Sequence, residues 1–411
     1  MNSLPSGHVF VIGLDSGTQL TPKIAEIISQ AQVVAGPSRF LQEFIDLKAL
    51  IIPLTGKLEP FLQNILELSQ TQQIVVLASG DPNFYGIAKR LLQTIPSERI
   101  TILPGTTTIQ KAFAKLKTTW ADVPVVSLHG REGFRTFFAA LYRAGRMDGA
   151  GYLAVYTDSE NTPGVIAQKI LDRHFPQWEM YVFEDLDSQK EKVSLLSLAE
   201  AQKTTFSPLN LVVLHKSCDF IPLTLGSPES LFNHEAAMIT KSEIRVNALG
   251  LLDFRGNETL WDIGAGSGSV SLEAAILLPY GEVIGVEKNP QRILQAISNR
   301  TRFGIPHVDF IQGEAQEILP SLPTPDRVFF GGGGADLAAL IEIAKKRLSP
   351  NGIIVASVIS LASLEEAVRA LTGPTGAPPE VIQLAVARSQ KLADSFYFKP
   401  LNQVYLVKGQ F

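Results

Sequence analysis

The sequence predicts an α/β protein of two domains, each built on a mainly parallel β-sheet. With 411 residues, the chain is too long for one ordinary hydrophobic core. Short apolar runs rich in β-branched residues alternate with longer amphipathic stretches, which is the pattern of strand–helix–strand units. Residues 216–229 interrupt this pattern with two prolines, a glycine and little periodicity, and we interpret them as a linker or docking segment. The predicted domains therefore span residues 1–215 and 230–411.

The apolar runs of the first domain predict six strands. They are His8–Gly13, Ile74–Ser79, Arg99–Pro104, Val123–His129, Gly151–Thr157 and Asn210–His215. Helices are expected between them, for example over Thr21–Gln30 and Pro163–Arg173.

The second domain has a more regular pattern, with seven predicted strands. The last two have no long helix between them, so we expect an antiparallel pair that closes the sheet. The seven are Leu260–Gly264, Glu282–Glu287, Val308–Gly313, Asp326–Gly331, Gly352–Val358, Val381–Arg388 and Gln403–Gly409.

Composition excludes several classes of protein. The formal net charge of −4 gives no global basic field for nucleic acid. The single cysteine, Cys218, cannot form a disulfide within the chain, and the six histidines do not cluster with it at metal-ligand spacing. The N-terminal residues lack the pattern of a signal peptide, and no apolar run reaches the ~20 residues that span a bilayer. We expect a cytoplasmic protein that needs no metal and binds neither nucleic acid nor membrane.

The sharpest motif is a glycine-rich turn at Leu260–Gly268, LWDIGAGSG. Such a turn lets the backbone approach a ligand closely, and the helix that starts at Ser269 presents free N–H groups to it. Glu287 ends the next predicted strand, where a carboxylate can accept hydrogen bonds from both hydroxyls of a ribose. A dinucleotide fingerprint would place its third glycine where this chain has Ser269. The spacing G-x-G-x-G after an acidic residue, Asp262, instead resembles the first motif of Rossmann-like S-adenosylmethionine methyltransferases.

A second glycine run follows the strand at Asp326–Gly331. Methyltransferases of base amino groups often carry an Asn/Asp-Pro-Pro-aromatic motif here, whereas this chain has four glycines that include Gly332 and Gly333. Two interpretations stay open. The run is either a low loop that lets a large flat substrate lie over the methyl donor, or a flexible connection without a ligand.

The second domain as a whole resembles the decarboxylating C15 precorrin methyltransferases of cobalamin synthesis. The resemblance covers residues 230–411 and rests on HEAAMITKSEIR, LWDIGAGSGSVSLEAA, VEKNP, GEAQEILPSLPTPDRVFFGGGG and NGIIVASV. The first domain, over residues 7–214, resembles the tetrapyrrole methylases that act at C5 of a precorrin. The motifs there are FVIGLDSG, AGPSRFL, VVLASGDPNFYGIAKRL, PGTTTIQKAFAKL and VVSLHGRE.

The order of the two halves is that of the bifunctional, decarboxylating precorrin-6Y C5,15-methyltransferases. The resemblance implies a two-lobed tetrapyrrole methylase fold followed by a Rossmann-like methyltransferase fold. It also implies one S-adenosylmethionine site per domain, a polycarboxylate precorrin substrate and a homo-oligomer. Methyl transfer from a sulfonium needs alignment and water exclusion more than a strong base, and the conjugated macrocycle can take up the electrons released by decarboxylation.

The resemblance implies methyl-donor contacts in both domains. In the first these are Gly13, Gly80, Asp81, Pro82 and Phe84; in the second they are Thr240, Asp262, Gly264, Ala265, Gly266, Ser267, Gly268, Glu287, Glu314 and Ala315.

A carboxylate-rich substrate predicts cationic clefts. We expect Arg131 and His129 to bind substrate together with the glycine pair Gly332 and Gly333. A solvated helix face is the favoured interpretation for the later arginines of the same segment, Arg143 and Arg146. In the second domain the predicted catalytic residues are His234, as a proton donor to the ring, with Lys241 and Arg245. The last two have an equal alternative, in which they cap a helix or pair with Glu243. Trp120 and Trp261 are expected in the core.

Two other functions remain as alternatives. A methyltransferase of RNA would need a basic face with aromatic stacking platforms, which the net acidity disfavours. An NAD-dependent Rossmann oxidoreductase would need the missing third glycine and would leave the first domain unexplained.

Overall fold

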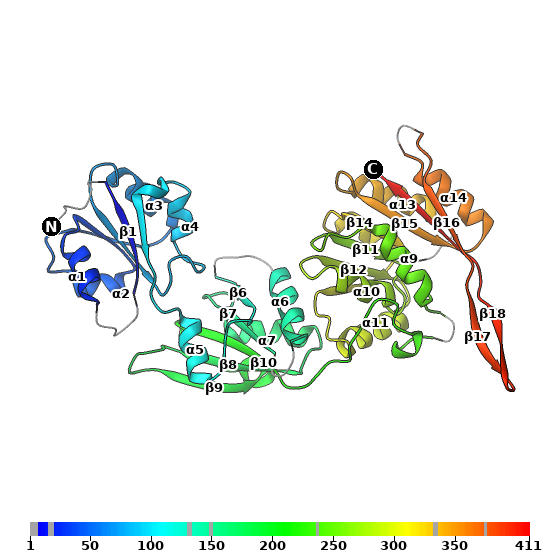
Figure 1. The fold of residues 1–411 in the computed structure, drawn as a ribbon, viewed down its shortest axis with the longest axis horizontal. Helices are drawn as coiled ribbons and strands as arrows, with labels where there is room; N and C mark the ends of the chain where they lie inside the picture. Colours follow the sequence, from blue (N-terminus) through cyan, green and yellow to red (C-terminus); the bar gives the residue numbers. More distant parts are fainter. Residues whose placement is uncertain are drawn as a thin grey trace.

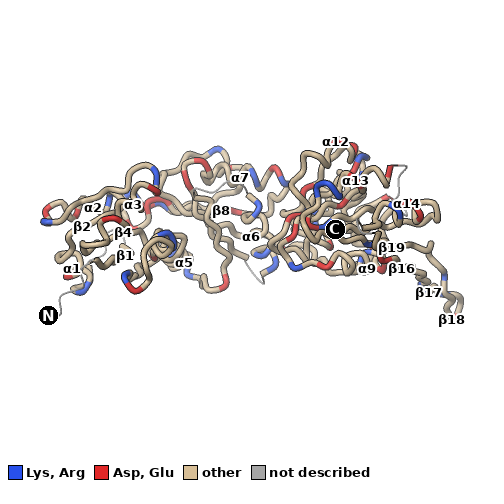
Figure 2. Tube along the Cα trace, turned by 90° about the horizontal axis from the view of Figure 1, so that it is seen from above, with Lys and Arg blue, Asp and Glu red and all other residues tan. Residues whose placement is uncertain are grey.

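A computed structural model describes residues 7–14, 20–129, 134–147, 151–235, 238–331, 336–373 and 376–411. Three β-sheets follow one another along an elongated molecule, and a two-stranded hairpin projects beyond the third (Figure 1). Acidic and basic residues are interspersed along the molecule (Figure 2). Among the described residues, no helix is both long and apolar enough to cross a membrane.

The first sheet forms the N-terminal lobe. Its five strands are all parallel, in the order β3-β2-β4-β1-β5, and two separate apolar clusters pack against them. Burial on both faces explains why β1 and β4 are continuous apolar runs. The strands are β1 (Val9–Leu14), β2 (Val33–Gly36), β3 (Leu50–Pro53), β4 (Ile74–Ser79) and β5 (Ile100–Leu103), and the helices are α1 (Pro22–Ser29), α2 (Ser38–Leu41), α3 (Leu58–Leu68) and α4 (Ala88–Leu92).

The second sheet forms a middle lobe, in the order β6-β7-β10-β8-β9. Only the pair β6 and β7 is parallel; the other neighbours are antiparallel. The expectation of mainly parallel sheets is therefore wrong for this lobe. Its strands are β6 (Val125–Ser127), β7 (Tyr152–Tyr156), β8 (Trp178–Glu184), β9 (Lys192–Ser197) and β10 (Asn210–Lys216), and its helices are α5 (Thr108–Leu116), α6 (Arg135–Gly145), α7 (Pro163–Asp172) and α8 (Leu198–Ala201).

The third sheet has the order β13-β12-β11-β14-β15-β19-β16. The first five strands are parallel, and β19 pairs antiparallel with both β15 and β16, which confirms the predicted closing pair. The strands are β11 (Thr259–Ile263), β12 (Glu282–Glu287), β13 (Val308–Gln312), β14 (Arg327–Phe330), β15 (Ile353–Val358), β16 (Glu380–Leu384) and β19 (Val404–Gln410). The helices are α9 (Ser242–Leu252), α10 (Ser269–Leu277), α11 (Pro290–Arg302), α12 (Ala315–Ile318), α13 (Leu337–Arg347) and α14 (Leu361–Leu371).

One predicted strand is wrong in its extent. The run Val381–Arg388 is divided between β16 and β17 (Ala387–Leu392), and β17 pairs with β18 (Ser395–Pro400) in a hairpin outside the main sheet. The hairpin extends away from the domain (Figure 1), and nearly all of its residues are exposed.

The segment 216–229 lies against both neighbouring domains. Lys216 Nζ donates to the carbonyl of Met147 in the middle lobe at 3.3 Å, and the backbone N–H of Ile221 donates to the carbonyl of Arg302 in the C-terminal domain at 3.2 Å. The ring of Phe220 fills the space beside Gly145 and Gly304, so that a Cβ added at Gly304 would lie 2.3 Å from it. The segment is therefore packed against the middle lobe and the C-terminal domain and is not a free linker.

Helix α6 packs against the C-terminal domain. Arg143 stacks on the ring of Tyr280 at 4.7 Å, and Arg146 Nη2 donates to the carbonyl of Phe303 at 3.4 Å. The prediction of a solvated face for these two arginines is wrong, because the partner surface lies more than a hundred residues further along the chain.

His307 sits at this interface as a buried neutral imidazole. Its Nε2 donates to the carbonyl of Ala275 at 3.0 Å, Nδ1 has no partner, and the ring contacts Tyr142 with centroids 4.6 Å apart. Burial, together with the charges of Arg173 and Arg146, lowers its pKa to about 4.

We expect the free energy of unfolding to fall as the pH drops from about 6.5 towards about 4, because the unfolded chain takes up a proton at His307 before the folded one does. The loss from this group is up to about 3 kcal/mol. Denaturant unfolding of the wild type and of His307→Gln over this range checks it. An equally steep decline in the variant would show that His307 does not contribute.

Candidate active sites

Three glycines meet where β1, β4 and β5 end. A Cβ added at Gly13 would lie 1.8 Å from the carbonyl oxygen of Gly80 and 2.4 Å from the nitrogen of Gly105. Gly105 N–H donates to the Gly80 carbonyl at 3.1 Å, and Gly80 has a φ of +62°. These contacts leave no room for a side chain at Gly13 or Gly105, so bare backbone from these two strand ends lies at the edge of a cavity.

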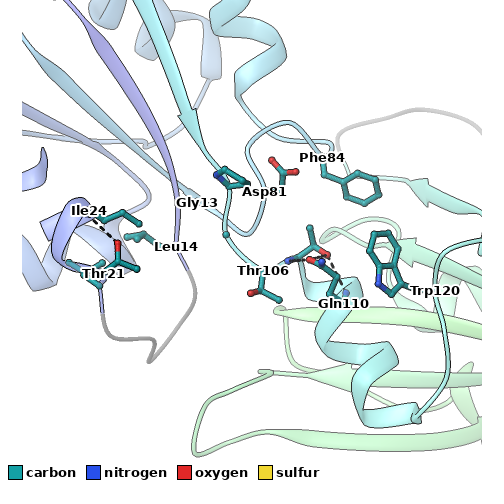
Figure 3. Close-up of a pocket in the computed structure, with 13 residues that line it drawn as sticks. Gly13, Leu14, Thr21, Ile24, Asp81, Phe84, Thr106, Gln110 and Trp120 are labelled. Atoms are coloured by element: carbon teal, nitrogen blue, oxygen red, sulfur yellow. Dashed lines mark hydrogen bonds between the residues drawn. The ribbon is translucent and has the colours of Figure 1, made fainter. Parts of the chain in front are cut away.

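This cavity, of about 560 Å³, lies between the two lobes of the N-terminal half. Figure 3 shows Thr21 and Ile24 of the first lobe on one side, Gln110 and Trp120 on the other, and Asp81 between them. Trp120 is 38% exposed and lines the cavity, so its predicted place in the core is wrong. The lining comprises Gly13, Leu14, Leu20, Thr21, Ile24, Asp81, Phe84, Pro104, Gly105, Thr106, Thr107, Gln110 and Trp120.

Asp81 and Phe84 also line a second, smaller cavity of about 270 Å³ on the other side of the Ser79–Pro82 turn. Tyr85 has a φ of +55°, uncommon for a residue with a side chain, and its Oη donates to the Val125 carbonyl of the middle lobe at 2.9 Å. Tyr85, just after the turn, therefore connects the two lobes beside the smaller cavity.

The remaining N-terminal predictions are placed as follows. His129 lines the smaller cavity, and its Nδ1 lies 3.3 Å from the Thr157 carbonyl, so that nitrogen is the donor. Gly80 lines the same cavity, whereas Pro82 is buried outside both linings and its carbonyl accepts from Ala88 N–H. Arg131 lies outside the described residues.

In the C-terminal domain the glycine turn runs from β11 into α10. Gly264, Gly266 and Gly268 have φ values of +77°, +55° and +78°, a conformation that L side chains rarely adopt. Glu287, at the end of β12, holds this turn: Oε2 accepts from Gly266 N–H at 2.9 Å, and Oε1 accepts from Asn289 N–H at 2.9 Å.

Two buried polar atoms near this turn have no partner. They are Oδ1 of Asp262 and Oγ of Ser267, both in residues at most 3% exposed. Oδ2 of Asp262 accepts from Ser271 Oγ, while burial raises the pKa of this carboxyl to about 6. Through this bond Asp262 connects β11 to the start of α10.

A cavity of about 520 Å³ opens beside the turn. Gly264, Glu287, Glu314 and Ala315 line it, four of the ten donor contacts predicted for this domain. The other six do not line it: Thr240, Asp262, Ala265, Gly266, Ser267 and Gly268.

The lining also includes Met238, Lys288 and Arg292, which were not predicted as site residues from the sequence. Met238 is 52% exposed at the cavity, and the Arg292 guanidinium pairs with Glu235 at 3.3 Å. Lys288 lies 3.9 Å from the Glu314 carboxylate. Lys288 is part of the VEKNP motif and could have been found from the sequence. Only the fold shows that Met238 lines the same cavity.

The predicted catalytic role of Arg245 is wrong. Its side chain is fully buried and its guanidinium pairs with Glu273 of α10, which is equally buried, at 2.7 Å. It also donates to the carbonyls of Thr240 and Ser227. With every neighbour internal, Arg245 has no access to a substrate, and its partner is Glu273 rather than the Glu243 named as an alternative.

The other predicted catalytic residues lie before α9. Lys241 occupies the N-cap position of that helix without a side-chain capping bond. Nδ1 of His234 lies 2.7 Å from the carbonyl of Glu235, and the residue does not line the cavity. Gly332 and Gly333 lie outside the described residues; Gly331, just before them, lines the cavity. Trp261 is fully buried, as predicted, and donates to the Pro323 carbonyl at 3.1 Å.

No group of three or more histidine, cysteine, aspartate or glutamate residues in the described ranges could hold a metal ion.

Comparison with known proteins matches each half to one family model. Residues 9–202 match the tetrapyrrole (corrin/porphyrin) methylases, and residues 230–408 match a precorrin methyltransferase domain. These comparisons give no support to the RNA methyltransferase or the oxidoreductase.

Similar proteins include the precorrin-6Y C(5,15)-methyltransferase [decarboxylating] of Sinorhizobium sp. It is 33% identical over 362 residues, which cover 86% of this chain and 84% of that protein. The cobalt-precorrin-6B C(15)-methyltransferase (decarboxylating) of Salmonella typhimurium is 34% identical over 44% of this chain and 94% of its own length. A crystal structure of precorrin-6y C5,15-methyltransferase from Geobacter metallireducens is 36% identical, with a TM-score of 0.43, over 45% of this chain and 97% of that one. The chain belongs to the family of decarboxylating precorrin-6Y C5,15-methyltransferases.

Proposed function

We propose that this chain methylates a precorrin-6Y-type tetrapyrrole at two positions, C5 in the N-terminal half and C15 in the C-terminal half, with loss of CO2 from an acetate side chain in the second reaction. The observation that carries the proposal is the pair of cavities, each beside a glycine turn and each within a different matched family region. The assignment uses residues 1–215 and 230–411 as the two catalytic domains, joined by residues 216–229.

Both cavities fit a nucleoside-bearing methyl donor. In the first, Gly13 and Gly105 present bare backbone where a Cβ would collide. In the second, Glu287 is placed to accept from ribose hydroxyls, and the unpartnered Ser267 Oγ lies in the glycine turn. S-adenosylmethionine, when bound, supplies an activated methyl group, so one donor site per domain is proposed.

The residues of this chain act mainly by position. Backbone segments at each glycine turn hold the donor close to the substrate, and walls such as Trp120 and Met238 keep water out. We propose Lys241, Lys288 and Arg292 as cations for substrate carboxylates in the C-terminal domain. His129 and Arg131 take this role in the N-terminal domain, Gly332 and Gly333 make room for the macrocycle, and His234 is proposed as the proton donor to the ring.

Incubation of the full chain with the tetrapyrrole and S-adenosylmethionine tests this proposal. Mass spectrometry should find two added methyl groups and the loss of one CO2 per macrocycle, with two molecules of S-adenosylhomocysteine released. A product with methyl groups on heteroatoms, or none at all, would contradict it.

We expect Glu287→Gln to weaken binding of the methyl donor at the C-terminal site by about 10–100-fold, because hydrogen bonds to a charged group contribute about 1.5–3 kcal/mol. The uncharged amide also places an NH2 where Gly266 and Asn289 donate. The KM for S-adenosylmethionine in the C15 reaction measures the effect. Glu317→Gln, an exposed acid on α12, is the matched control; an unchanged KM in Glu287→Gln would contradict the assignment.

A homo-oligomer is proposed through the β17–β18 hairpin. An isolated two-stranded hairpin is marginally stable in water, and this one exposes Leu392, Phe396 and Phe398 at 62%, 73% and 69%. Its open edges also offer unpaired backbone groups to the same hairpin of a second copy. Light scattering should find an oligomer for the wild type and for Leu294→Ser, a control at an isolated exposed residue, and a monomer for Phe396→Ser/Phe398→Ser. A monomeric wild type would overturn this part.

A further inference from the structure

Arg388, at the base of the projecting hairpin, binds two acidic residues that lie far from it in the sequence, Glu229 and Glu243. Its Nη1 and Nη2 donate to the two carboxylate oxygens of Glu229 at 2.8 and 2.9 Å. Its Nε and Nη2 donate to the two oxygens of Glu243 at 2.8 and 2.5 Å. One guanidinium therefore makes two bidentate pairs, an arrangement that fixes geometry more tightly than a single surface ion pair.

The two acids, Glu229 and Glu243, lie on segments that lead to the C-terminal cavity. Glu243 is in the first turn of α9, and Glu229 ends the docking segment that arrives from the middle lobe. The hydrogen bonds from Arg388, opposed in part by burial, hold the pKa of Glu229 at about 2. Both acids are thus available as anionic partners at neutral pH.

Glu229 also caps helix α9 from a distance. The N-cap residue Lys241 provides no side-chain cap, and Glu229 Oε1 accepts the free N–H of Ser242 at 2.8 Å instead. Ser242 Oγ in turn lies 3.1 Å from Arg388 Nη2. The position of the start of α9 therefore depends on Arg388.

The start of α9 continues directly into the cavity wall. Met238 lines the cavity, and only Ile239, Thr240 and Lys241 separate it from the helix. Arg245 anchors the inner side of this stretch through the Thr240 carbonyl, whereas Arg388 anchors the outer side. The two arginines therefore anchor both sides of the segment that leads from Met238 to α9.

We infer that Arg388 is a positioning residue for the C15 reaction: by clamping Glu229 and Glu243 it holds the Met238–Lys241 segment against the donor cavity. The inference rests on the proposed function of the C-terminal domain. Arg388 does not line the cavity and touches no reacting group. It acts through α9, from the base of a hairpin that projects from the same domain (Figure 1).

The test compares both reactions of the full chain in Arg388→Gln. We expect the KM for S-adenosylmethionine in the C15 reaction to rise about tenfold, because a small displacement of a cavity wall has large kinetic effects. The C5 kinetics, measured on the same preparation, should stay unchanged. Arg388→Lys should recover part of the loss, since an ammonium can pair with the acids but cannot form two bidentate contacts. Arg369→Gln, which removes an exposed ion pair with Glu365 on α14, is the matched control.

A second variant distinguishes loss of the Arg388 contacts from a general loss of stability. Glu229→Gln/Glu243→Gln removes the same contacts from the other side and should raise the KM equally, and adding Arg388→Gln should cause no further increase. A C15 KM within twofold of the wild type in Arg388→Gln, or an equal loss in the C5 reaction, would overturn the inference. Absence of C15 methylation in the wild type would instead overturn the proposed function itself.

Discussion

Replacement of Gly13 by valine is expected to abolish C5 methylation and to leave C15 methylation intact. The β1, β4 and β5 strand ends are so close at Gly13 that even a Cβ would overlap the Gly80 carbonyl oxygen, at 1.8 Å. A larger side chain must push the turn into the donor cavity or separate the strands. Assay of each methylation with the full chain, product by product, measures the effect.

The C15 reaction in the same molecule reports whether the C-terminal domain still folds. Gly250→Ala is a suitable control, because a Cβ at this exposed helical position meets nothing within 4 Å. C5 activity within a few fold of the wild type in Gly13→Val would show that the glycine contacts do not shape the site.

The second large effect is on stability. Arg245→Met is expected to lower the free energy of unfolding of the C-terminal domain by about 3–5 kcal/mol, because the buried Glu273 carboxylate loses its only ion-pair partner among the described residues. Gly226 N–H still donates to it at 3.1 Å, which compensates only in part. Denaturant unfolding of the full chain, followed through the C-terminal transition, measures the loss.

The double variant Arg245→Met/Glu273→Leu separates the two interpretations of Arg245. Replacing the whole buried pair by apolar residues should restore most of the stability. If Arg245 instead bound substrate, Arg245→Met would fold with normal stability and lose only affinity for the tetrapyrrole.

Much of the fold could be predicted from the sequence because most core strands are continuous apolar runs. β4 and β12 match their predicted bounds, and β1, β7, β10 and β15 differ by one residue at one or both ends. β8 was missed although it is a mostly buried strand of seven residues, because polar residues interrupt its apolar run. The other strands that were missed from the main sheets carry weaker signals. β2 and β3 have only four residues each, and the edge strand β9 is mostly exposed, so no long run of one kind marks them.

The candidate site residues also divide into those with a local sequence signal, which were predicted, and those without one, which were not. Gly264 and Glu287 were predicted because they lie at the carboxyl ends of recognisable strands, which meet at one edge of a parallel sheet, whereas Glu314 and Ala315 were predicted from the family resemblance. Arg245 was misplaced because its partner lies on α10, and nothing local distinguishes a buried arginine from a substrate-binding one.

Tertiary contacts also account for the remaining errors. Trp120 reaches the first cavity only because α5 is placed across from the β1 turn, and the arginines of α6 meet the C-terminal domain only after both domains have folded. Such contacts join distant residues, and neither periodicity nor motif spacing records them.

The most direct test of the central claim is the number of S-adenosylmethionine molecules that one full-length chain binds, measured by calorimetry. We predict two sites per chain: Gly13→Val should remove one of them, and Glu287→Gln should weaken the other. One site in the wild type, or the same site affected by both substitutions, would contradict a protein with two independent methyl-donor sites.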